Sequence, residues 1–547
     1  MSNDQMYSDF DHQPNKEQFK DLFIYFYGLK YKTKLFGKWL KNCSESIQLP
    51  WFKDLMGQAE QARLLQKAAA EHGRLRASLK GRTAIVIGGS MAGLWTARVL
   101  VDHFDQVIIL ERDQLPAQPE PRPGVPQGHQ VHLLLLRGLQ IMQTLFPGLD
   151  SELKAAGAVP FDLTMDARAR LSGQWLTPFP SGKIMLGCSR LLLETNIRRR
   201  LQQQPKVRFI EGVKVTGLLT DPEKQTVTGV TLQEQRRTGK VEPNLDALTA
   251  TFVVDASGRT SATPQWLAEI GYDAPQETLV NSYAGYASRR YKRPAHHPAD
   301  WQMLGILPLP PHERRGGLII PEEDGRWMVT LSGAMKDYPP TDEPGFLAFA
   351  RSLAPEFYQA IKAAEPLAPI RGYRQTENRL RHYEKLTRWP GNFVVVGDAL
   401  CAFNPIYAQG MTVAAMTALA LGEHLAQANG DFADVAQKFQ RAAARIIKPV
   451  WLMATRPDIQ WSKASCSQPG WLTGWGHWYL NQLLATAMNS RYINETFLEV
   501  SHLLKPASAL LAPGVLLRLG YHYLKGRQAI QDITHSFPDE LISQESL

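Results

Sequence analysis

The chain has 547 residues, 44% of them hydrophobic and 21% charged, which is typical of a soluble globular protein with two or three domains. Its formal net charge is +9, but the lysines and arginines are scattered and no nucleic-acid-binding motif accompanies them, so we expect no nucleic-acid partner. The four cysteines form no C-x-x-C pair, which argues against a zinc site or a disulfide framework, and we expect no metal and a reducing compartment.

Residues 1–80 are predicted to form a basic, amphipathic, helical extension. Between residues 16 and 42, aromatic and aliphatic side chains recur at helical spacing among seven lysines. Two interpretations remain open: this stripe packs on the protein's own body, or it makes a peripheral contact with a membrane. No apolar run is long enough for a spanning helix, and the acidic first residues do not fit a secretory signal, so we expect a cytoplasmic protein.

From Thr83 the pattern changes to strand, glycine turn, helix and strand, in "TAIVIGG", "SMAGLWTARVLVDHF" and "QVIILERD". This order predicts a parallel β-α-β unit. The turn keeps Gly88 and Gly93 of the dinucleotide fingerprint G-x-G-x-x-G, and Ser90, a small residue whose hydroxyl can donate to a phosphate oxygen, replaces the middle glycine. Glu111 ends the second strand at the spacing of an acid that binds ribose hydroxyls. The unit therefore predicts dinucleotide binding without separating NAD from FAD.

Further along the chain, "GLIIPEEDGRWMVTLSG" predicts a hairpin that turns at Asp324-Gly325, within a largely antiparallel sheet over about 280–335. "NFVVVGDA" predicts another buried strand, and "MTVAAMTALALGEHL" predicts a helix after it. The remainder, to Leu547, is predicted to be mostly helical.

Two aspartates follow predicted buried strands, Asp255 in "VVDASGRTS" and Asp398 in "VVVGDALCAFNPIYAQGMTVAA". Taken singly, such aspartates are more often turn or cap residues. Their order after the nucleotide turn favours a cofactor site, because an aspartate can hold ribityl hydroxyls and the backbone N–H groups of a helix start can face a flavin.

Taken together, these motifs resemble those of FAD-dependent monooxygenases of the para-hydroxybenzoate hydroxylase fold. The chain is most similar to the flavin epoxidases of polyether biosynthesis, of the lasalocid and monensin type, which belong to secondary metabolism. The resemblance runs from Thr83 to the mid-400s. It rests on the blocks "RPGVPQGHQVHLLL", "CSRLLLE", "VVDASGR", "PEEDGRWMVTLSG", "NRLRHYEKLTRWP" and "GDALCAFNPIYAQGMT".

The resemblance implies a mixed α/β fold, in which a Rossmann-like FAD-binding domain carries an inserted antiparallel-sheet substrate domain and a helical C-terminal region follows. We place the FAD-binding domain at 81–275 and 391–425, the substrate domain at 276–390 and the helical region at 426–547. The implied cofactor contacts are Gly88, Gly89, Ser90, Gly93, Glu111, Arg112, Arg122, Arg190, Asp398, Pro405, Gly410 and Met411. For Arg122 and for Arg190, the alternative is that the side chain is a surface ion-pair partner.

No catalytic acid or base emerges from the pattern. Phe403 and Tyr407 are expected to point inward, either lining an apolar substrate pocket or packing in the core. Two features depart from the family. Ala408 replaces a loop glycine, which reshapes the loop or strains it if that position needs positive φ. "DASG" replaces the "DG" of aromatic hydroxylases, in a segment that also serves nicotinamide binding there, so NAD(P)H and a separate reductase both remain open as electron donors.

By this resemblance, the reaction inserts one oxygen atom from O2 into an apolar, alkene-bearing small molecule, by epoxidation or hydroxylation, through a C4a-hydroperoxyflavin. One alternative is an FAD-dependent reductase or dehydrogenase that acts on a prenyl lipid. Another is a non-catalytic FAD-binding protein that is recruited by its basic arm. A halogenase is set aside because the W-x-W-x-I-P block of those enzymes is absent.

Overall fold

The structure is a computed structural model that describes residues 81–523, with gaps at 172, 235–245, 296–299, 429, 433, 462–464, 467–472 and 488–489. The chain divides into two units, residues 1–74 and 75–547. The predicted helical extension, and with it the predicted membrane contact at residues 16–42, lies outside the described residues. The elements below all belong to the second unit.

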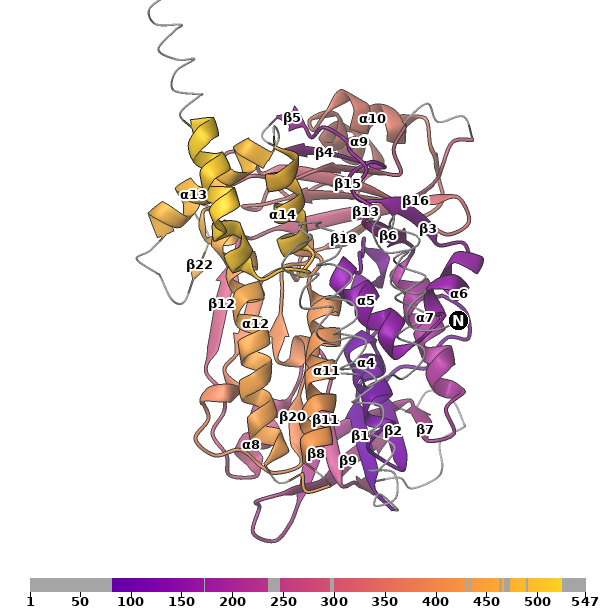
Figure 1. The fold of residues 1–547 in the computed structure, drawn as a ribbon. Coiled ribbons are helices and arrows are strands. Elements are labelled where there is room, and N and C mark those ends of the chain that lie inside the picture. Colours follow the sequence, from indigo (N-terminus) through magenta and orange to yellow (C-terminus); the bar gives the residue numbers. More distant parts are fainter. Residues whose placement is uncertain are drawn as a thin grey trace, which may run out of the picture. The chain divides into compact units, whose positions relative to one another are not determined.

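A five-stranded parallel sheet, in the order β20-β11-β1-β2-β7, forms the first layer of this unit (Figure 1). Its central strands are runs of buried valine and isoleucine, as expected for parallel strands covered on both faces. The strands are β1 (Thr83–Ile87), β2 (Gln106–Glu111), β7 (Val207–Glu211), β11 (Phe252–Asp255) and β20 (Phe393–Val395). Because β20 pairs with β11 from far along the chain, two separated segments build this layer, as the sequence predicts.

Helices pack against this sheet and against one another. Figure 1 shows α4 (Met91–Leu100), α11 (Gly410–Gln427) and α12 (Val435–Ile459) side by side, and α11 packs against both of the others. Their shared core includes the fully buried Trp95 and Phe439. The further helical elements of this layer are η3 (Pro126–His129), α5 (Leu136–Leu145), α6 (Leu149–Ala155), α7 (Arg190–Gln202), α8 (Thr263–Glu269), η4 (Tyr383–Lys385), η5 (Gly397–Ala399) and η6 (Pro405–Tyr407).

A second, mostly antiparallel sheet follows the order β17-β13-β16-β15-β14-β4-β5, with β18 beside β13. The predicted hairpin is confirmed: β15 (Arg315–Glu322) and β16 (Arg326–Gly333) are joined by Asp324 and Gly325, both at positive φ. The other strands are β4 (Ala167–Leu171), β5 (Gln174–Trp175), β13 (Gly285–Lys292), β14 (Met303–Ile306), β17 (Glu365–Pro366) and β18 (Arg371–Tyr373). One face of this sheet packs on α9 (Glu343–Arg351) and α10 (Pro355–Lys362).

The second sheet also draws on the segment that the sequence assigned to the FAD-binding domain. β4 pairs in parallel with β14, so residues 167–175 extend the sheet although they precede the predicted boundary at 275. The periodicity of so short a strand does not reveal which sheet it joins.

Smaller elements complete the unit. A three-stranded sheet holds β8 (Val213–Thr220), β9 (Val227–Glu234) and β10 (Ala247–Thr249), and β3 (Val159–Asp162) pairs with β6 (Ile184–Gly187). A four-stranded sheet joins β12 (Glu277–Asn281), β19 (Asn378–Arg381), β21 (Cys401–Ala402) and β22 (Ser465–Cys466). The C-terminal helices include α13 (Thr473–Ala487), α14 (Arg491–Ser501) and η7 (Ala507–Leu511). Within the described residues, no helix is both long and apolar enough to cross a membrane.

Candidate functional site

The glycine turn between β1 and α4 is fixed by close backbone contacts. Gly88 has φ +104°, and a Cβ there would lie 2.6 Å from the carbonyl oxygen of Ala256. A Cβ on Gly93 would lie 1.9 Å from the carbonyl oxygen of Gly88. Neither position accepts a side chain, so both glycines of the incomplete fingerprint have the packing role that their spacing predicts.

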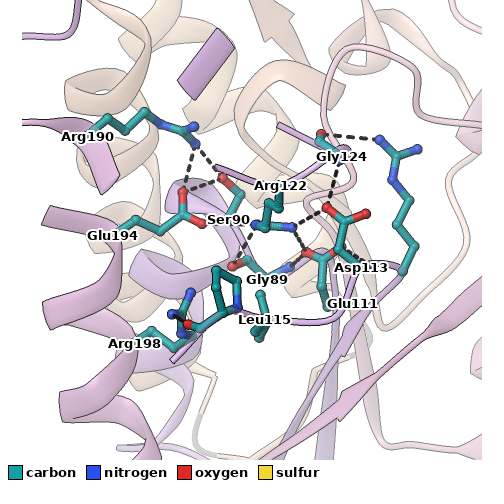
Figure 2. Close-up of polar contacts among 12 residues, drawn as sticks. Gly89, Ser90, Glu111, Asp113, Leu115, Arg122, Gly124, Arg190, Glu194 and Arg198 are labelled. Carbon is teal, nitrogen blue, oxygen red and sulfur yellow. Dashed lines mark hydrogen bonds and ion pairs between the residues drawn. The ribbon is translucent and has the colours of Figure 1, made fainter. Parts of the chain in front are cut away.

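Ser90, which replaces the middle glycine, is the N-cap residue of α4 but makes no side-chain cap. Its hydroxyl donates instead to Glu194 Oε2 at 3.1 Å and accepts from Arg190 Nη2 at 2.5 Å (Figure 2). The serine therefore joins the glycine turn to α7, a contact that glycine cannot make.

Arg122 lies at the centre of a buried charge network (Figure 2). Its guanidinium forms ion pairs of 3.0 Å with Glu111, Asp113 and Glu194. Burial alone would lower its pKa, but the three carboxylates outweigh burial and raise the pKa above its ordinary value. The predicted alternative of a surface ion pair is wrong for Arg122, because Arg122 is buried together with Glu111 and Glu194.

Glu111, the predicted ribose acceptor, lies in the same network. Its carboxylate accepts the backbone N–H of Gly89 at 2.8 Å and that of Asp113 at 3.0 Å. These bonds hold the acid at the carboxyl end of β2, where it lines the cavity described below.

Arg190, at the start of α7, faces the same cavity and is also buried rather than on the surface. It pairs with Glu194 at 3.0 Å through Nη2, while its Nη1 is buried and has no hydrogen-bond partner among the residues that the structure describes. Burial lowers the pKa of Arg190, an effect that Glu194 opposes. A buried guanidinium with an unused donor is suited to an anionic ligand group.

A cavity of about 590 Å³ extends from the glycine turn to the second sheet. The predicted cofactor residues that line it are Gly88, Ser90, Glu111, Arg112, Arg122, Arg190, Asp398, Pro405, Gly410 and Met411. Gly89 and Gly93 lie behind this lining and shape the turn. The N-termini of α4 and α11 both reach the cavity and neither has a side-chain cap, so free backbone N–H groups are directed toward a ligand.

The two aspartates that follow buried strands differ in their surroundings. Asp255 accepts hydrogen bonds from the backbone N–H of Ser257 and from the hydroxyls of Ser261 and Thr263, so it is a turn residue. Asp398 lines the cavity beside the start of α11. Burial raises the pKa of Asp398, although the charge of Arg259 opposes the shift.

The loop before α11 keeps the backbone shape that a glycine would favour. Ala408 has φ +52° and ψ +22°, in the left-handed region. Of the two outcomes expected for this substitution, a reshaped loop and a strained one, the structure shows the second. Alanine in this conformation costs about 1 kcal/mol relative to glycine.

Of the two placements expected for Phe403 and Tyr407, pocket lining or core packing, Phe403 shows the first, whereas Tyr407 is not among the residues that line the cavity. The hydroxyl of Tyr407 is turned toward α12, where it is 2.9 Å from Asp458 Oδ1. Asp458 is buried and also accepts from the side-chain amides of Asn378 at 2.7 Å and Asn404 at 3.0 Å. Burial raises the pKa of Asp458, and these hydrogen bonds oppose the shift.

The wall that the second sheet contributes to the cavity is mixed rather than purely apolar. Ile306, Leu307 and Leu318 lie there beside three hydroxyl-bearing residues, Tyr286, Thr330 and Ser332.

Sequence reasoning missed several residues of this site. Glu194 bridges Arg122 and Arg190, and its position four residues after Arg190, the spacing of neighbours on one helix face, was an available signal. Arg259 also lines the cavity, and it belongs to the quoted block "VVDASGR". Asp458 lies on α12, beyond every motif, and no local pattern marks it.

Residues 82–436 match the family described as FAD binding domain. The chain is 33% identical over 445 residues to "Protein Rv3254" of Mycobacterium tuberculosis (strain ATCC 25618 / H37Rv), covering 79% of this chain and 91% of that protein.

Solved structures share the fold at low identity. A triple mutant of the flavin-dependent brominase Bmp2 has a TM-score of 0.56 at 17% identity, covering 83% of this chain and 99% of that one. PqsL of Pseudomonas aeruginosa, a probable FAD-dependent monooxygenase, has a TM-score of 0.51 at 17% identity, covering 69% of this chain and 97% of that one. The myxobacterial chondrochloren halogenase CndH has a TM-score of 0.53 at 17% identity, covering 77% and 97%.

Proposed function

Because the chain belongs to the FAD binding domain family and is an FAD-dependent oxidoreductase, we propose that it inserts one oxygen atom from O2 into an apolar, alkene-bearing small molecule. The product is an epoxide or an alcohol. One observation carries this proposal: a single cavity joins the nucleotide turn to the second sheet, so a cofactor and a small molecule have room to meet there.

The residues present fit FAD. The unused Nη1 of Arg190 and the uncapped N-termini of α4 and α11 suit the pyrophosphate and the electron-rich edge of a flavin. Glu111 and Asp398 are carboxylates at the carboxyl ends of β2 and β20, where they can accept from ribose and ribityl hydroxyls. Bound FAD would supply electron transfer and the activation of O2.

The chain itself would position the substrate and exclude water. Phe403, Leu318 and Ile306 give the cavity apolar surface against which an alkene chain can pack. Electrons would come from NAD(P)H or from a separate reductase.

Labelled dioxygen tests the proposal. The holoenzyme is reduced anaerobically, mixed with ¹⁸O2 in the presence of candidate polyenes, and the products are analysed by mass spectrometry. One labelled oxygen atom in the product is the expected result. A product that gains two hydrogens and no label would identify a reductase acting on the alkene instead, and flavin reoxidation with no product from any polyene would favour a non-catalytic flavoprotein.

A further inference from the structure

The cavity wall formed by β13 and β16 carries a small array of hydroxyl groups. Tyr286 is paired with Ser332 across the two strands, and Ser288 is paired with Thr330, so all four side chains lie on one face of the sheet. The opposite face holds Ala287, Val329 and Leu331, which pack in the core with α9 and α10. The hydroxyl face is therefore the one directed toward the cavity.

The hydrogen of Thr330 is committed to the protein. Gln130 Nε2 donates to the carbonyl oxygen of Arg371 at 3.1 Å, which fixes its Oε1 as the atom facing Ser288 at 2.6 Å. Ser288 must donate its single hydrogen to that oxygen, because an amide oxygen only accepts. In the 2.6 Å contact between Ser288 and Thr330, Thr330 is consequently the donor.

The hydrogen of Tyr286 is committed in the same way. Asn404 Oδ1 accepts the backbone N–H of Ile406 at 3.3 Å, and Asn404 Nδ2 donates to Asp458, so the orientation of this amide is fixed. Tyr286 therefore donates to Asn404 Oδ1 at 2.6 Å. Burial raises the pKa of Tyr286 well above its ordinary value, so the hydroxyl keeps its hydrogen at neutral pH.

A ligand that reaches either hydroxyl from the cavity thus meets an oxygen with lone pairs and no free hydrogen. We propose that Tyr286 and Thr330 form a subsite for a substrate group that donates hydrogen bonds, such as an alcohol or an amine, in preference to an ether, an ester or a ketone. The inference rests on the proposed function, since it adds a polar group to the alkene-bearing substrate.

Ser288 offers a sharp test because it does not line the cavity and is almost fully buried. Removing its hydroxyl in Ser288→Ala frees the hydrogen of Thr330, which can then donate to a ligand. In Thr330→Val the acceptor itself disappears. Ser288→Ala touches no ligand but turns Thr330 from an acceptor into a possible donor. Thr330→Val removes one of the two acceptors of the subsite.

The probes are geraniol and geranyl methyl ether, which differ only in whether the oxygen carries a hydrogen. Each is titrated into the oxidised, FAD-bound enzyme, and binding is followed by the flavin absorbance. We expect the wild type to bind the alcohol about three- to tenfold more tightly than the ether, the worth of one hydrogen bond. In Thr330→Val the alcohol should lose this advantage, and in Ser288→Ala the ether should gain affinity.

Equal affinity of both probes in the wild type would overturn the proposal, and so would a preference that Ser288→Ala and Thr330→Val both leave unchanged. A lack of response to geraniol and to longer prenyl alcohols would also count against it. FAD content and Tm of each variant identify misfolding, and Tyr286→Phe provides a second variant of the same subsite. Because the titration needs no turnover, its failure is distinguishable from a failure of oxygen insertion in the ¹⁸O2 experiment.

Discussion

The substitution Glu194→Gln tests the buried charge network most directly. Glu194 is the only acid that pairs with both arginines, because its two oxygens contact Arg122 and Arg190 at 3.0 Å each within the described residues. Glutamine keeps the shape of the side chain and removes the charge. Arg122 retains Glu111 and Asp113, but Arg190 loses its carboxylate partner.

Breaking a buried ion pair by removing one partner typically costs about 3–5 kcal/mol, because the remaining charge stays desolvated. Since Arg122 keeps two partners, we expect the lower end of that range, about 3 kcal/mol, in the protein without FAD. A bound pyrophosphate would supply Arg190 with a new anion. The loss of stability should therefore be smaller when FAD is present.

Thermal and urea unfolding of both proteins, with and without FAD, measures these differences. Glu152→Gln is a matched control, since Glu152 pairs with Arg200 at the surface and such pairs contribute about 0–1 kcal/mol. An apo-protein with Glu194→Gln that is as stable as the Glu152→Gln control would refute the network as a stabilising element. An equal loss with and without FAD would instead refute the placement of the pyrophosphate beside Arg190.

Further predictions follow from single residues. Ala408→Gly removes a left-handed alanine and should raise the unfolding free energy by about 0.5–1 kcal/mol in urea titrations, while a decrease would show that the loop does not need positive φ. Asp458→Asn keeps an oxygen for the amides of Asn378 and Asn404 and should retain FAD. Asp458→Leu leaves both amide donors unpaired and should lower the unfolding free energy by about 2–4 kcal/mol. Equal behaviour of the two variants would contradict the role of Asp458 as acceptor for these amides. Burial lowers the pKa of His502 from 6.5 to about 4, so between these pH values the unfolded state binds a proton that the folded state excludes. The stability that this group contributes is therefore present above pH 6.5 and is lost as the pH falls toward 4. The stability difference between wild type and His502→Gln should therefore shrink by about 2 kcal/mol between pH 7.5 and pH 5, and a constant difference would argue against a buried neutral imidazole.

The features that sequence predicted well are those in which local pattern and backbone geometry coincide. Gly93 is required by a contact with Gly88 inside one β-α-β unit, Gly88 has a positive φ at its own turn, and the Asp324-Gly325 hairpin needs only the conformations of its own turn. Asp255 was ambiguous because a turn aspartate and a ligand aspartate have the same local sequence. The hydrogen bonds that Asp255 accepts from Ser261 and Thr263 show that it is a turn residue.

The features that sequence could not predict depend on distant contacts. The sequence left two placements open for Tyr407, pocket lining or core packing, because its direction is set by Asp458, which lies about fifty residues further on and on another helix. The hydrogen positions of Tyr286 and Thr330 depend on Asn404 and Gln130 in the same way. Each such contact joins segments that have no periodic relation in the chain, so no local pattern encodes it.

The network also separates two roles that sequence had given to both arginines alike. Arg122 and Arg190 both line the cavity, yet the terminal nitrogens of Arg122 are committed to three carboxylates and to the carbonyl of Gly89. Nη1 of Arg190, in contrast, has no partner within the described part of the chain. Three acids and two arginines leave this cluster with an excess of one negative charge, which does not favour an anion. We expect attraction for a pyrophosphate to come from the free donor of Arg190, from the N–H groups at the start of α4 and from Arg112, which also lines the cavity. We therefore propose that Arg122 orders the turn and that Arg190 binds the cofactor.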